Sequence, residues 1–372
     1  MSGITPVKMP KWGLSMIEGK VTGWLKAEGD AVQAGEELVE VETSKITNVG
    51  EATESGVLRR IIAHVDDTLP VGALLAVMAP PDVSDADIDA FIAEFNANFA
   101  FEEEVGGGGG LTQRSVDAGG VRLNVAYAGE GGAGVPVVFI HGFGGDAENW
   151  TLAMGALADA RVVYAIELPG HGKSDKRIAD ADPNALAHTI LSALDALQLD
   201  RINLVGHSLG GAVALAAALA APHRVATLTL VCAAGLPGAR VNAAYIDGFI
   251  AAGRARDMQR VAEMLFADPS LATKDLAENL VRAKRIDGVE EALTALRVMM
   301  FDTPALAGLG ARLGAVASPL LIVTGDADAV VSAPDDALLP ASAQRLRIPG
   351  AGHMPQIEKA DAFNAALKAH IA

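Results

Sequence analysis

Residues 202–220 read INLVGHSLGGAVALAAALA. The apolar run 202–205 leads into a Gly-rich turn that holds Ser208, and an Ala-rich segment, 212–221, follows the turn. A strand, a tight turn and a helix in direct succession require small residues at the turn, because bulky side chains would collide with both elements. We therefore predict that Ser208 stands at a strand-to-helix junction, close to the free N–H groups of the helix N-terminus.

The sequence on both sides of this junction, residues 111–372, alternates apolar runs with helical patterns. Strands are expected at 121–127, 137–140, 162–166, 202–205, 228–232, 320–324 and 345–348. Most of these runs are continuous in Val, Ile and Leu, as in parallel strands that are buried on both faces. They predict an α/β domain at 111–372. Between about 236 and 312 helical segments rich in Ala, Arg and Leu replace the strands, and we interpret this stretch as an inserted cap.

A serine hydroxyl becomes a nucleophile when a general base and an acid that orients the base lie beside it. His353 follows the last expected strand and completes the chain order serine, acid, histidine. Two acids, Asp326 and Asp328, follow the strand at 320–324, and the residues alone leave both open. We predict that Ser208 is a nucleophile and that His353 is its base.

Negative charge that develops on an attacked carbonyl oxygen needs preset hydrogen-bond donors. Residues 141–145, HGFGG, follow the expected strand at 137–140, and their glycines allow the backbone to approach a substrate closely. We predict that the backbone N–H groups of Phe143 and Leu209 form an oxyanion hole.

Together these motifs cover nearly all of residues 111–372 and resemble the α/β-hydrolases. In hydrolases with a similar acid segment, the acid stands at the position of Asp328. The resemblance therefore implies that Asp328 orients His353 and that Asp326 is a hydrogen-bonding loop residue. Ser208 at the turn argues against haloalkane dehalogenase and epoxide hydrolase chemistry, which uses Asp there.

Residues 1–80 contain an internal repeat at a spacing of 37 residues. The corresponding positions are Gly19 and Gly56, Val21 and Leu58, Trp24 and Ile61, Leu25 and Ile62, Asp30 and Asp67, Val32 and Leu69, Gly35 and Gly72, and Leu38 and Leu75. Each half alternates short apolar runs with Gly, Asp or Pro, as short strands joined by tight turns do. The repeat predicts a pseudo-twofold all-β unit of two packed sheets. Lys45 falls between the halves, at an expected turn.

This first region resembles the lipoyl carrier domains of 2-oxo-acid and acetoin dehydrogenase complexes. The matching residues are Met9, Pro10, Gly19, Trp24, Gly29, Asp30, Val32, Gly35, Leu38, Glu40, Val41, Glu42, Thr43 and Lys45. The resemblance implies that Lys45 carries lipoate in amide linkage at an exposed hairpin tip. Biotin carriers of the same fold place Met on both sides of this lysine, where the present chain has Ser44 and Ile46. Lipoate is therefore favoured over biotin.

Residues 81–110 are interpreted as an acidic and Gly-rich linker between the two domains. Apolar residues recur within it at helical spacing after the expected N-cap Ser84: Ile88, Phe91, Ile92, Phe95 and Phe99. Two interpretations stay open, an acidic tether with a transient helix and a short docking helix for a partner subunit. Five consecutive glycines at 106–110 predict a flexible coil.

The composition excludes several classes of function. A net charge of −17 argues against binding a nucleic-acid backbone, which needs clustered Lys and Arg. The single cysteine, Cys232, forms no internal disulfide or CxxC site, so we expect a buried, inert thiol and no metal. No apolar run reaches the roughly 18 residues of a membrane span. These features predict a cytoplasmic protein with no nucleic-acid or membrane partner.

A lipoyl domain followed by an α/β-hydrolase domain resembles the acetyltransferase (E2) components of acetoin dehydrogenase complexes. The resemblance implies transfer of an acetyl group from S-acetyldihydrolipoyl-Lys45 to CoA through Ser208, His353 and Asp328. It also implies a homo-oligomer and two partner enzymes, a thiamine-diphosphate-dependent E1 and a dihydrolipoamide dehydrogenase (E3). Apolar cap residues are expected to exclude water and to make room for CoA, namely Leu265, Phe266, Met299, Met300 and Phe301. The alternatives are an esterase or thioesterase with an attached carrier, and a non-catalytic lipoyl scaffold.

Overall fold

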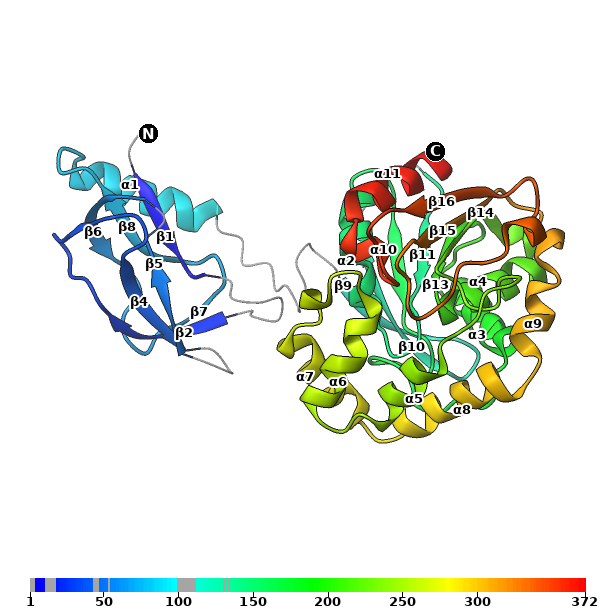
Figure 1. Ribbon diagram of the computed structural model, residues 1–372. Coiled ribbons are helices and arrows are strands. Elements are labelled where there is room, and N and C mark those ends of the chain that lie inside the picture. The colour runs from blue at the N-terminus through cyan, green and yellow to red at the C-terminus, as the bar shows by residue number, and fades with distance from the viewer. Residues whose placement is uncertain are drawn as a thin grey trace. The chain divides into compact units, whose positions relative to one another are not determined.

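The computed structural model describes residues 4–10, 18–42, 47–52, 54–98, 112–129, 132 and 134–372 (Figure 1). The chain divides into two compact units, Met1–Gly110 and Leu111–Ala372. In the residues that the structure describes, the first unit is built from strands with one helix, and the second alternates strands and helices. The predicted fold class, an all-β unit followed by an α/β unit, is confirmed.

The first unit contains two four-stranded sheets. One sheet has the order β1 (Thr5–Lys8), β8 (Leu74–Ala79), β6 (Gly56–Ile61) and β3 (Ala31–Val32). The other has the order β5 (Thr47–Glu51), β4 (Glu37–Glu42), β2 (Glu18–Trp24) and β7 (Thr68–Pro70). A shift of 37 residues pairs β2, β3 and β4 with β6, β7 and β8. When the members of each pair are exchanged, the order β8, β6, β3 of one sheet becomes the order β4, β2, β7 of the other. The predicted pseudo-twofold arrangement is present in the structure.

The repeat extends to individual hydrogen bonds and to the core. The Asp30 carboxylate accepts the Ala27 N–H at 2.8 Å, and 37 residues later the Asp67 carboxylate accepts the His64 N–H at 2.7 Å. Each pair closes the same tight turn, because a short Asp side chain reaches a backbone N–H three residues away. Both halves also contribute fully buried side chains to one apolar core, namely Val21, Leu38, Leu58 and Leu75.

Lys45, the predicted attachment site, lies outside the described residues, as do Ser44 and Ile46. The strands on either side of it in sequence are β4 and β5. They pair antiparallel, with Glu42 opposite Thr47.

Helix α1 (Asp85–Asn98) belongs to the first unit, where it packs on strand β8. Ser84 Oγ accepts the Asp87 N–H at 3.2 Å, as expected of an N-cap residue. Ile88 is fully buried, and Phe91 and Phe95 pack against the same apolar cluster. The apolar stripe therefore covers the unit's own sheet, which corrects the two linker interpretations, a transient helix in a tether and a helix with a stripe free for a partner. Phe99 and the glycines at 106–110 lie outside the described residues.

The second unit is built on an eight-stranded sheet. Its order is β16 (Gln344–Ile348), β15 (Leu320–Gly325), β14 (Val225–Val231), β13 (Ile202–His207), β11 (Val137–Ile140), β12 (Val163–Ile166), β10 (Arg122–Ala128) and β9 (Thr112–Asp117). Strands β11 to β16 run parallel, whereas β10 pairs antiparallel with β9 and β12. Strand β9 was not expected from the sequence, because this edge strand is mostly exposed and reads TQRSVD, without an apolar run.

Helices cover both faces of this sheet. Alternate residues of a strand point to opposite faces, so Val138 and Ile140 join one apolar cluster with helices α3 (Pro183–Ala196) and α4 (Leu209–Ala220). Val137 and Phe139 join a second cluster with α2 (Thr151–Leu157) and α11 (Ala360–His370). Strands buried on both faces explain the continuous apolar runs in the sequence.

The chain between β14 and β15 forms helices and turns. These helices are α5 (Ala243–Ala251), α6 (Ala255–Ala262), α7 (Lys274–Lys284), α8 (Val289–Asp302) and α9 (Ala305–Gly310). Within the described residues, no single helix is long and apolar enough to cross a membrane. One pair, Val289–Asp302 with Ala305–Ala315, meets that test jointly on length and composition alone, with a bend of 64° between its members.

Candidate active site

Ser208 stands between the end of β13 and the start of α4. Its backbone has a φ of 53° and a ψ of −118°, a conformation that is strained for a residue other than glycine. Two backbone hydrogen bonds stabilise this conformation, from Ser208 N to Val231 O at 2.9 Å and from Ala234 N to Ser208 O at 3.0 Å. Val231 is the last residue of β14 and Ala234 lies in the segment that follows it, so the neighbouring strand and its extension fix the turn.

Glycines around Ser208 are required by close packing. A Cβ atom on Gly210 would clash with the backbone carbonyls of Ile140 and His141, and one on Gly211 would clash with Ala233. The turn is therefore pressed against the ends of the two strands beside β13, as the small residues in the sequence predicted.

His353 and Asp328 form a buried pair at the ends of β16 and β15. Nδ1 of His353 lies 2.9 Å from Oδ2 of Asp328, and the two side chains are 2% and 4% exposed. Oδ1 of Asp328 accepts the N–H groups of Val330 at 2.8 Å and Val331 at 2.9 Å. Burial alone would raise the pKa of Asp328, but His353 and these donors outweigh it, so the pKa lies below its ordinary value. The carboxylate is thus ionised and oriented toward the imidazole.

Asp326, the other candidate acid, has a different role in the structure. Its carboxylate accepts the Gly350 N–H at 2.8 Å, and it holds the loop before His353. The structure therefore brings Asp328, and not Asp326, to the imidazole of His353.

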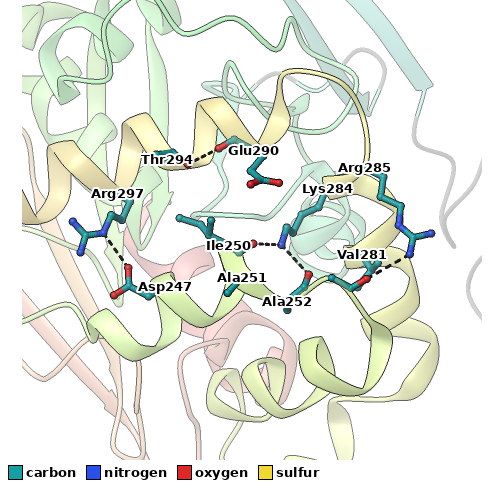
Figure 2. A pocket seen from close by; sticks show the side chains of 11 residues that line it. Asp247, Ile250, Ala251, Ala252, Val281, Lys284, Arg285, Glu290, Thr294 and Arg297 are labelled. Carbon is teal, nitrogen blue, oxygen red and sulfur yellow. Dashed lines mark hydrogen bonds and ion pairs between the residues drawn. The ribbon is translucent and has the colours of Figure 1, made fainter.

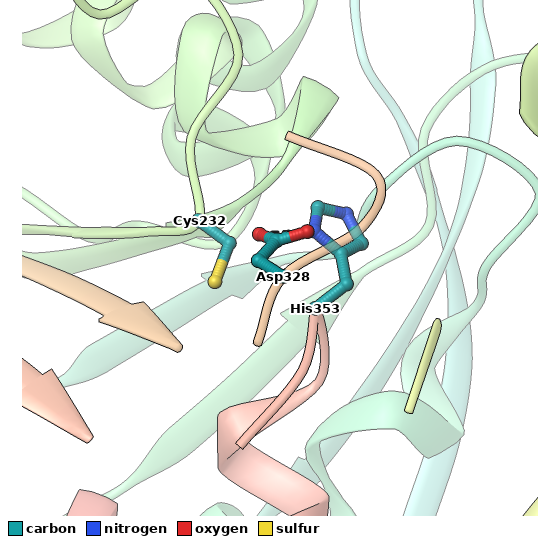
Figure 3. Close-up of side chains that lie close together, drawn as sticks. All are labelled: Cys232, Asp328 and His353. Carbon is teal, nitrogen blue, oxygen red and sulfur yellow. Dashed lines mark hydrogen bonds and ion pairs between the residues drawn. The ribbon is translucent and has the colours of Figure 1, made fainter. Parts of the chain in front are cut away.

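Cys232 lies beside this pair, and Figure 3 shows the Asp328 carboxylate between its side chain and the His353 ring. Ligand atoms of the three residues lie within 4.8 Å of one another. Burial raises the pKa of the Cys232 thiol well above its ordinary value, so the sulfur stays protonated. A metal binds the thiolate form, which this environment disfavours.

The turn that holds Ser208 reaches His353 through His207, and no hydrogen bond joins Ser208 itself to His353 among the described residues. Within the described part of the chain, neither Ser208 Oγ nor Nε2 of His353 has a hydrogen-bond partner. The ring of His207, the residue before Ser208, lies 4.6 Å from the ring of His353 between centroids. Hydrogen bonds between catalytic groups are often long before substrate binds, so this geometry is compatible with a nucleophile and its base.

The loop that follows β11 lies against Ser208. A Cβ atom on Gly142 would lie 2.9 Å from Cβ of Ser208, so glycine is needed there. The described residues offer no hydrogen-bond acceptor to the backbone N–H groups of Phe143 and Leu209. Leu209 N is the first of the helix N–H groups that have no partner inside the helix. Both predicted donors are therefore free to bind an oxyanion.

Two buried histidines, His141 and His171, hold the Phe143 loop. Nε2 of His171 accepts the Gly144 N–H at 3.1 Å, and Nε2 of His141 accepts the Leu168 N–H at 2.9 Å. Burial lowers the pKa of His171 to about 4 and that of His141 well below its ordinary value. Both rings are neutral at pH 7, since each must keep one nitrogen unprotonated as an acceptor.

Phe249 of helix α5 packs over the same loop. Its ring lies 5.6 Å from the Phe143 ring in an edge-on contact, and a Cβ atom on Gly144 would clash with it. Its carbonyl accepts the Lys284 ammonium at 2.6 Å. Lys284 thereby ties α7 to the end of α5 and holds Phe249 against the loop.

Lys284 also lines a groove of about 430 Å³ on the cap, between α5, α7 and α8 (Figure 2). Its ammonium donates to Phe249 O and, at 2.9 Å, to Ala252 O, while Arg297 pairs with Asp247 at 3.0 Å. These two cations are satisfied by the protein itself. Arg285, a third cation that lines the groove, donates to Gly253 O at 3.4 Å.

Of the five apolar cap residues expected at the site, Leu265 and Phe266 lie beside His353. The His353 N–H donates to Leu265 O at 2.8 Å, and Phe266 packs with Met354. Met299 and Met300 are buried in the main core instead. Phe301 packs at the edge of that core and lines a separate apolar groove with Leu306 and Leu338. The order of the cap helices, which composition does not reveal, decides this distribution.

Sequence reasoning missed two residues of the site, His207 and Phe249. His207 had a signal, because it directly precedes Ser208, the predicted nucleophile, and every side chain at such a turn is confined. Phe249 had none, since it is one apolar residue among several on a cap helix.

Comparison with known proteins assigns both units to families. Residues 135–360 match the family described as the α/β hydrolase fold, and residues 5–78 match the family described as biotin-requiring enzyme. A solved 2-hydroxy-6-oxo-6-phenylhexa-2,4-dienoate hydrolase from a Rhodococcus species is similar, with a TM-score of 0.63 and 22% identity. The match covers 70% of this chain and 98% of that one, and it shows the fold alone. The protein is an α/β-hydrolase-fold protein with a biotin- or lipoyl-type unit attached.

Two full-length relatives define the family more closely. A dihydrolipoyllysine-residue acetyltransferase component of the acetoin cleaving system from Pseudomonas putida is 43% identical over 373 residues, covering 100% of this chain and 99% of the relative. The protein of the same description from Cupriavidus necator is 42% identical over 376 residues, covering 99% and 97%. The chain belongs to this family of acetyltransferase components, as the order of its two units predicted.

Proposed function

We propose that this chain transfers an acetyl group from S-acetyldihydrolipoyl-Lys45 to CoA, with Ser208 as nucleophile, His353 as base and Asp328 as the acid that orients it. One observation carries the proposal: a lipoyl-type unit and a strained serine, whose preceding residue His207 contacts a buried His353–Asp328 pair, occur in one chain of this acetyltransferase family. Lipoate on Lys45 supplies the thiol that carries the acetyl group, and CoA supplies the thiol that accepts it.

In the first half of the reaction, Nε2 of His353 takes the proton of the Ser208 hydroxyl as Oγ attacks the thioester carbonyl carbon. The negative charge that develops on the carbonyl oxygen is bound by Phe143 N–H and Leu209 N–H. The carbon–sulfur bond then breaks, and the departing thiol receives the proton from His353. Asp328 stabilises the imidazolium in the interval and keeps its ring oriented.

In the second half, His353 takes the proton of the CoA thiol, and the sulfur attacks the acetyl-Ser208 ester. The same two N–H groups bind the oxyanion, and the ester bond to Oγ breaks as His353 returns the proton to Ser208. A thioester is consumed and a thioester is formed, so the transfer needs no added energy. Water must be kept out for this exchange, and Leu265 and Phe266 beside His353 contribute to its exclusion.

The fit of lipoate to the carrier unit rests on chemistry and on the described strands. Lys45 offers the amine that an amide-linked lipoyl group needs, and it belongs to the short segment between the antiparallel strands β4 and β5. The proposed domain division is a carrier at 1–80, a connection at 81–110 and a catalytic domain at 111–372 with its cap at about 236–312. Helix α1 is added to the carrier, because its apolar side is buried there.

The relatives are components of a multienzyme system, as their names state. We propose a thiamine-diphosphate-dependent E1 that loads the acetyl group and a dihydrolipoamide dehydrogenase (E3) that reoxidises the arm, with homo-oligomeric assembly of this chain. A cytoplasmic location completes the proposal, because CoA and such partner enzymes are available there.

The decisive experiment supplies the purified protein with S-acetyldihydrolipoamide and CoA and measures acetyl-CoA against free acetate. Acetyl-CoA is expected as the main product. Predominant acetate would overturn the transferase and favour the alternative, an esterase or thioesterase with an attached carrier, whose fold is that of the similar hydrolase structure.

A further inference from the structure

His207 links the nucleophile turn to the general base. Its ring is buried, and Nε2 lies 2.8 Å from the backbone carbonyl oxygen of His353, 146 residues away in the chain. A carbonyl oxygen only accepts hydrogen bonds, so Nε2 of His207 carries the proton and donates it. The base is thereby tied to the residue that precedes Ser208.

The other ring nitrogen of His207, Nδ1, is buried and has no hydrogen-bond partner among the described residues. It faces Gly142, where a Cβ atom would lie 2.8 Å from it. An N–H at Nδ1 would be an unsatisfied donor in this space, which costs about 1–3 kcal/mol. Burial first, and the proximity of His353 second, lower the pKa of His207 to about 3, so the ring is neutral at pH 7.

Both peptide groups of His353 are held. Its N–H donates to Leu265 O at 2.8 Å, and its carbonyl accepts from His207. Its side chain is held at Nδ1 by Asp328, which leaves Nε2 as the nitrogen that can turn toward Ser208. Three separate contacts thus fix the position of one imidazole.

We propose that His207 is a positioning residue for the general base of the reaction described under Proposed function, on which this inference rests. It acts by holding the carbonyl of His353 with a neutral N–H donor. The titratable groups that face it are His353, Asp328 and His141, and the ring of Trp150 packs edge-on against it at 6.3 Å between centroids. Because His353 becomes positively charged during turnover, a positively charged group in place of His207 would oppose that step.

The test compares two substitutions with a control. His207→Leu removes the donor, whereas His207→Gln keeps a neutral N–H at a similar reach. The control, His188→Leu, changes an exposed histidine on α3. Each variant is assayed for acetyl transfer to CoA and, separately, for hydrolysis of 4-nitrophenyl acetate, which needs the same base but no CoA. The ester assay reports on His207 even if transfer to CoA proves not to be the activity.

His207→Leu is expected to lower kcat about tenfold to a hundredfold, since small misplacement of a catalytic group has effects of this size. KM should change little, and the acidic limb of the pH profile of kcat should shift. His207→Gln is expected to restore most of kcat and the wild-type pH profile, and His188→Leu to leave both unchanged.

An unchanged kcat in His207→Leu would overturn the proposal. Equal losses in the Leu and Gln variants would also overturn it, because a role in packing alone does not distinguish a donor from an apolar side chain of similar size. If His207→Leu does not fold, His207→Asn takes its place, since its shorter amide does not reach the His353 carbonyl.

Discussion

The carrier unit and the catalytic site are built in opposite ways. In the carrier, the turn closed by Asp30 recurs 37 residues later around Asp67, and the same spacing relates three strands of one sheet to three strands of the other. In the catalytic unit, His353 contacts His207 across 146 residues and Asp328 across 25, and neither contact is repeated. Local repetition therefore specifies the carrier, whereas the order of strands in a parallel sheet assembles the site.

The two units can be tested separately, and the largest effect is expected from a substitution at Lys45 of the carrier. Lys45→Arg is expected to abolish lipoylation and all transfer that depends on the carrier, because an arginine side chain cannot form the amide. Transfer from free S-acetyldihydrolipoamide should persist. Intact mass from the native host checks the lipoyl adduct, with Lys26→Arg as the control. A biotin adduct on Lys45 would contradict the carrier assignment.

Ser208→Ala is the complementary test, which removes the reaction of the catalytic unit and leaves the carrier intact. Loss of a serine nucleophile lowers kcat by about a millionfold in hydrolases of known mechanism, and a loss of this order is expected for acetyl transfer. Lipoylation of Lys45 should be unaffected. A kcat near the wild-type value would show that His353 activates CoA for direct transfer without an acyl-serine.

The two aspartates after β15 offer a matched pair. Asp328→Asn is expected to lower kcat about ten-thousandfold, because the amide favours the wrong tautomer of the histidine. Asp326→Asn should leave kcat near the wild-type value, since an amide oxygen can still accept the Gly350 N–H. Similar losses in both variants would contradict the assignment of the acid.

The internal repeat predicts paired effects on stability. Leu38→Ala and Leu75→Ala, at corresponding positions, should each destabilise the carrier by about 2–5 kcal/mol, as for other fully buried leucines. Leu25→Ala, at a side chain that is 44% exposed, is the control and should have little effect. Thermal unfolding of the full chain measures both, while acetyl transfer from free substrate should be retained. Unequal effects at the two sites would weaken the pseudo-twofold description.

Acid should destabilise the catalytic unit through its buried histidines. The pKa of His171 falls from 6.5 to about 4 on burial, so between these values the unfolded chain binds a proton that the folded chain does not. Stability therefore falls as the pH decreases from 6.5 to about 4, by about 3 kcal/mol for this residue at most. His171→Gln should reduce that slope in pH-dependent unfolding, and His188→Gln should not.

Most of the architecture could be predicted because patterns among residues that are close in the sequence specify it. The apolar runs gave the strands β10 to β16, the small residues around Ser208 gave the turn, and the chain order gave His353. Strand β9 was not predicted, because an exposed edge strand needs no apolar run. The stripe of α1 was recognised, but its partner was not, since a helical pattern shows that a side is apolar and does not show what covers it.

The sequence by itself determined the two folds, the serine at the strand-to-helix junction and the family to which the chain belongs. Tertiary structure decided that Asp328 meets His353, that His207 holds the backbone carbonyl of His353, and that Phe249 packs over the loop that contains Phe143. The physical reason is how far apart the contacting residues lie in the sequence. Turns, strands and repeats are set by neighbours in the chain, whereas each of these contacts joins residues that only the sheet order and the cap bring together.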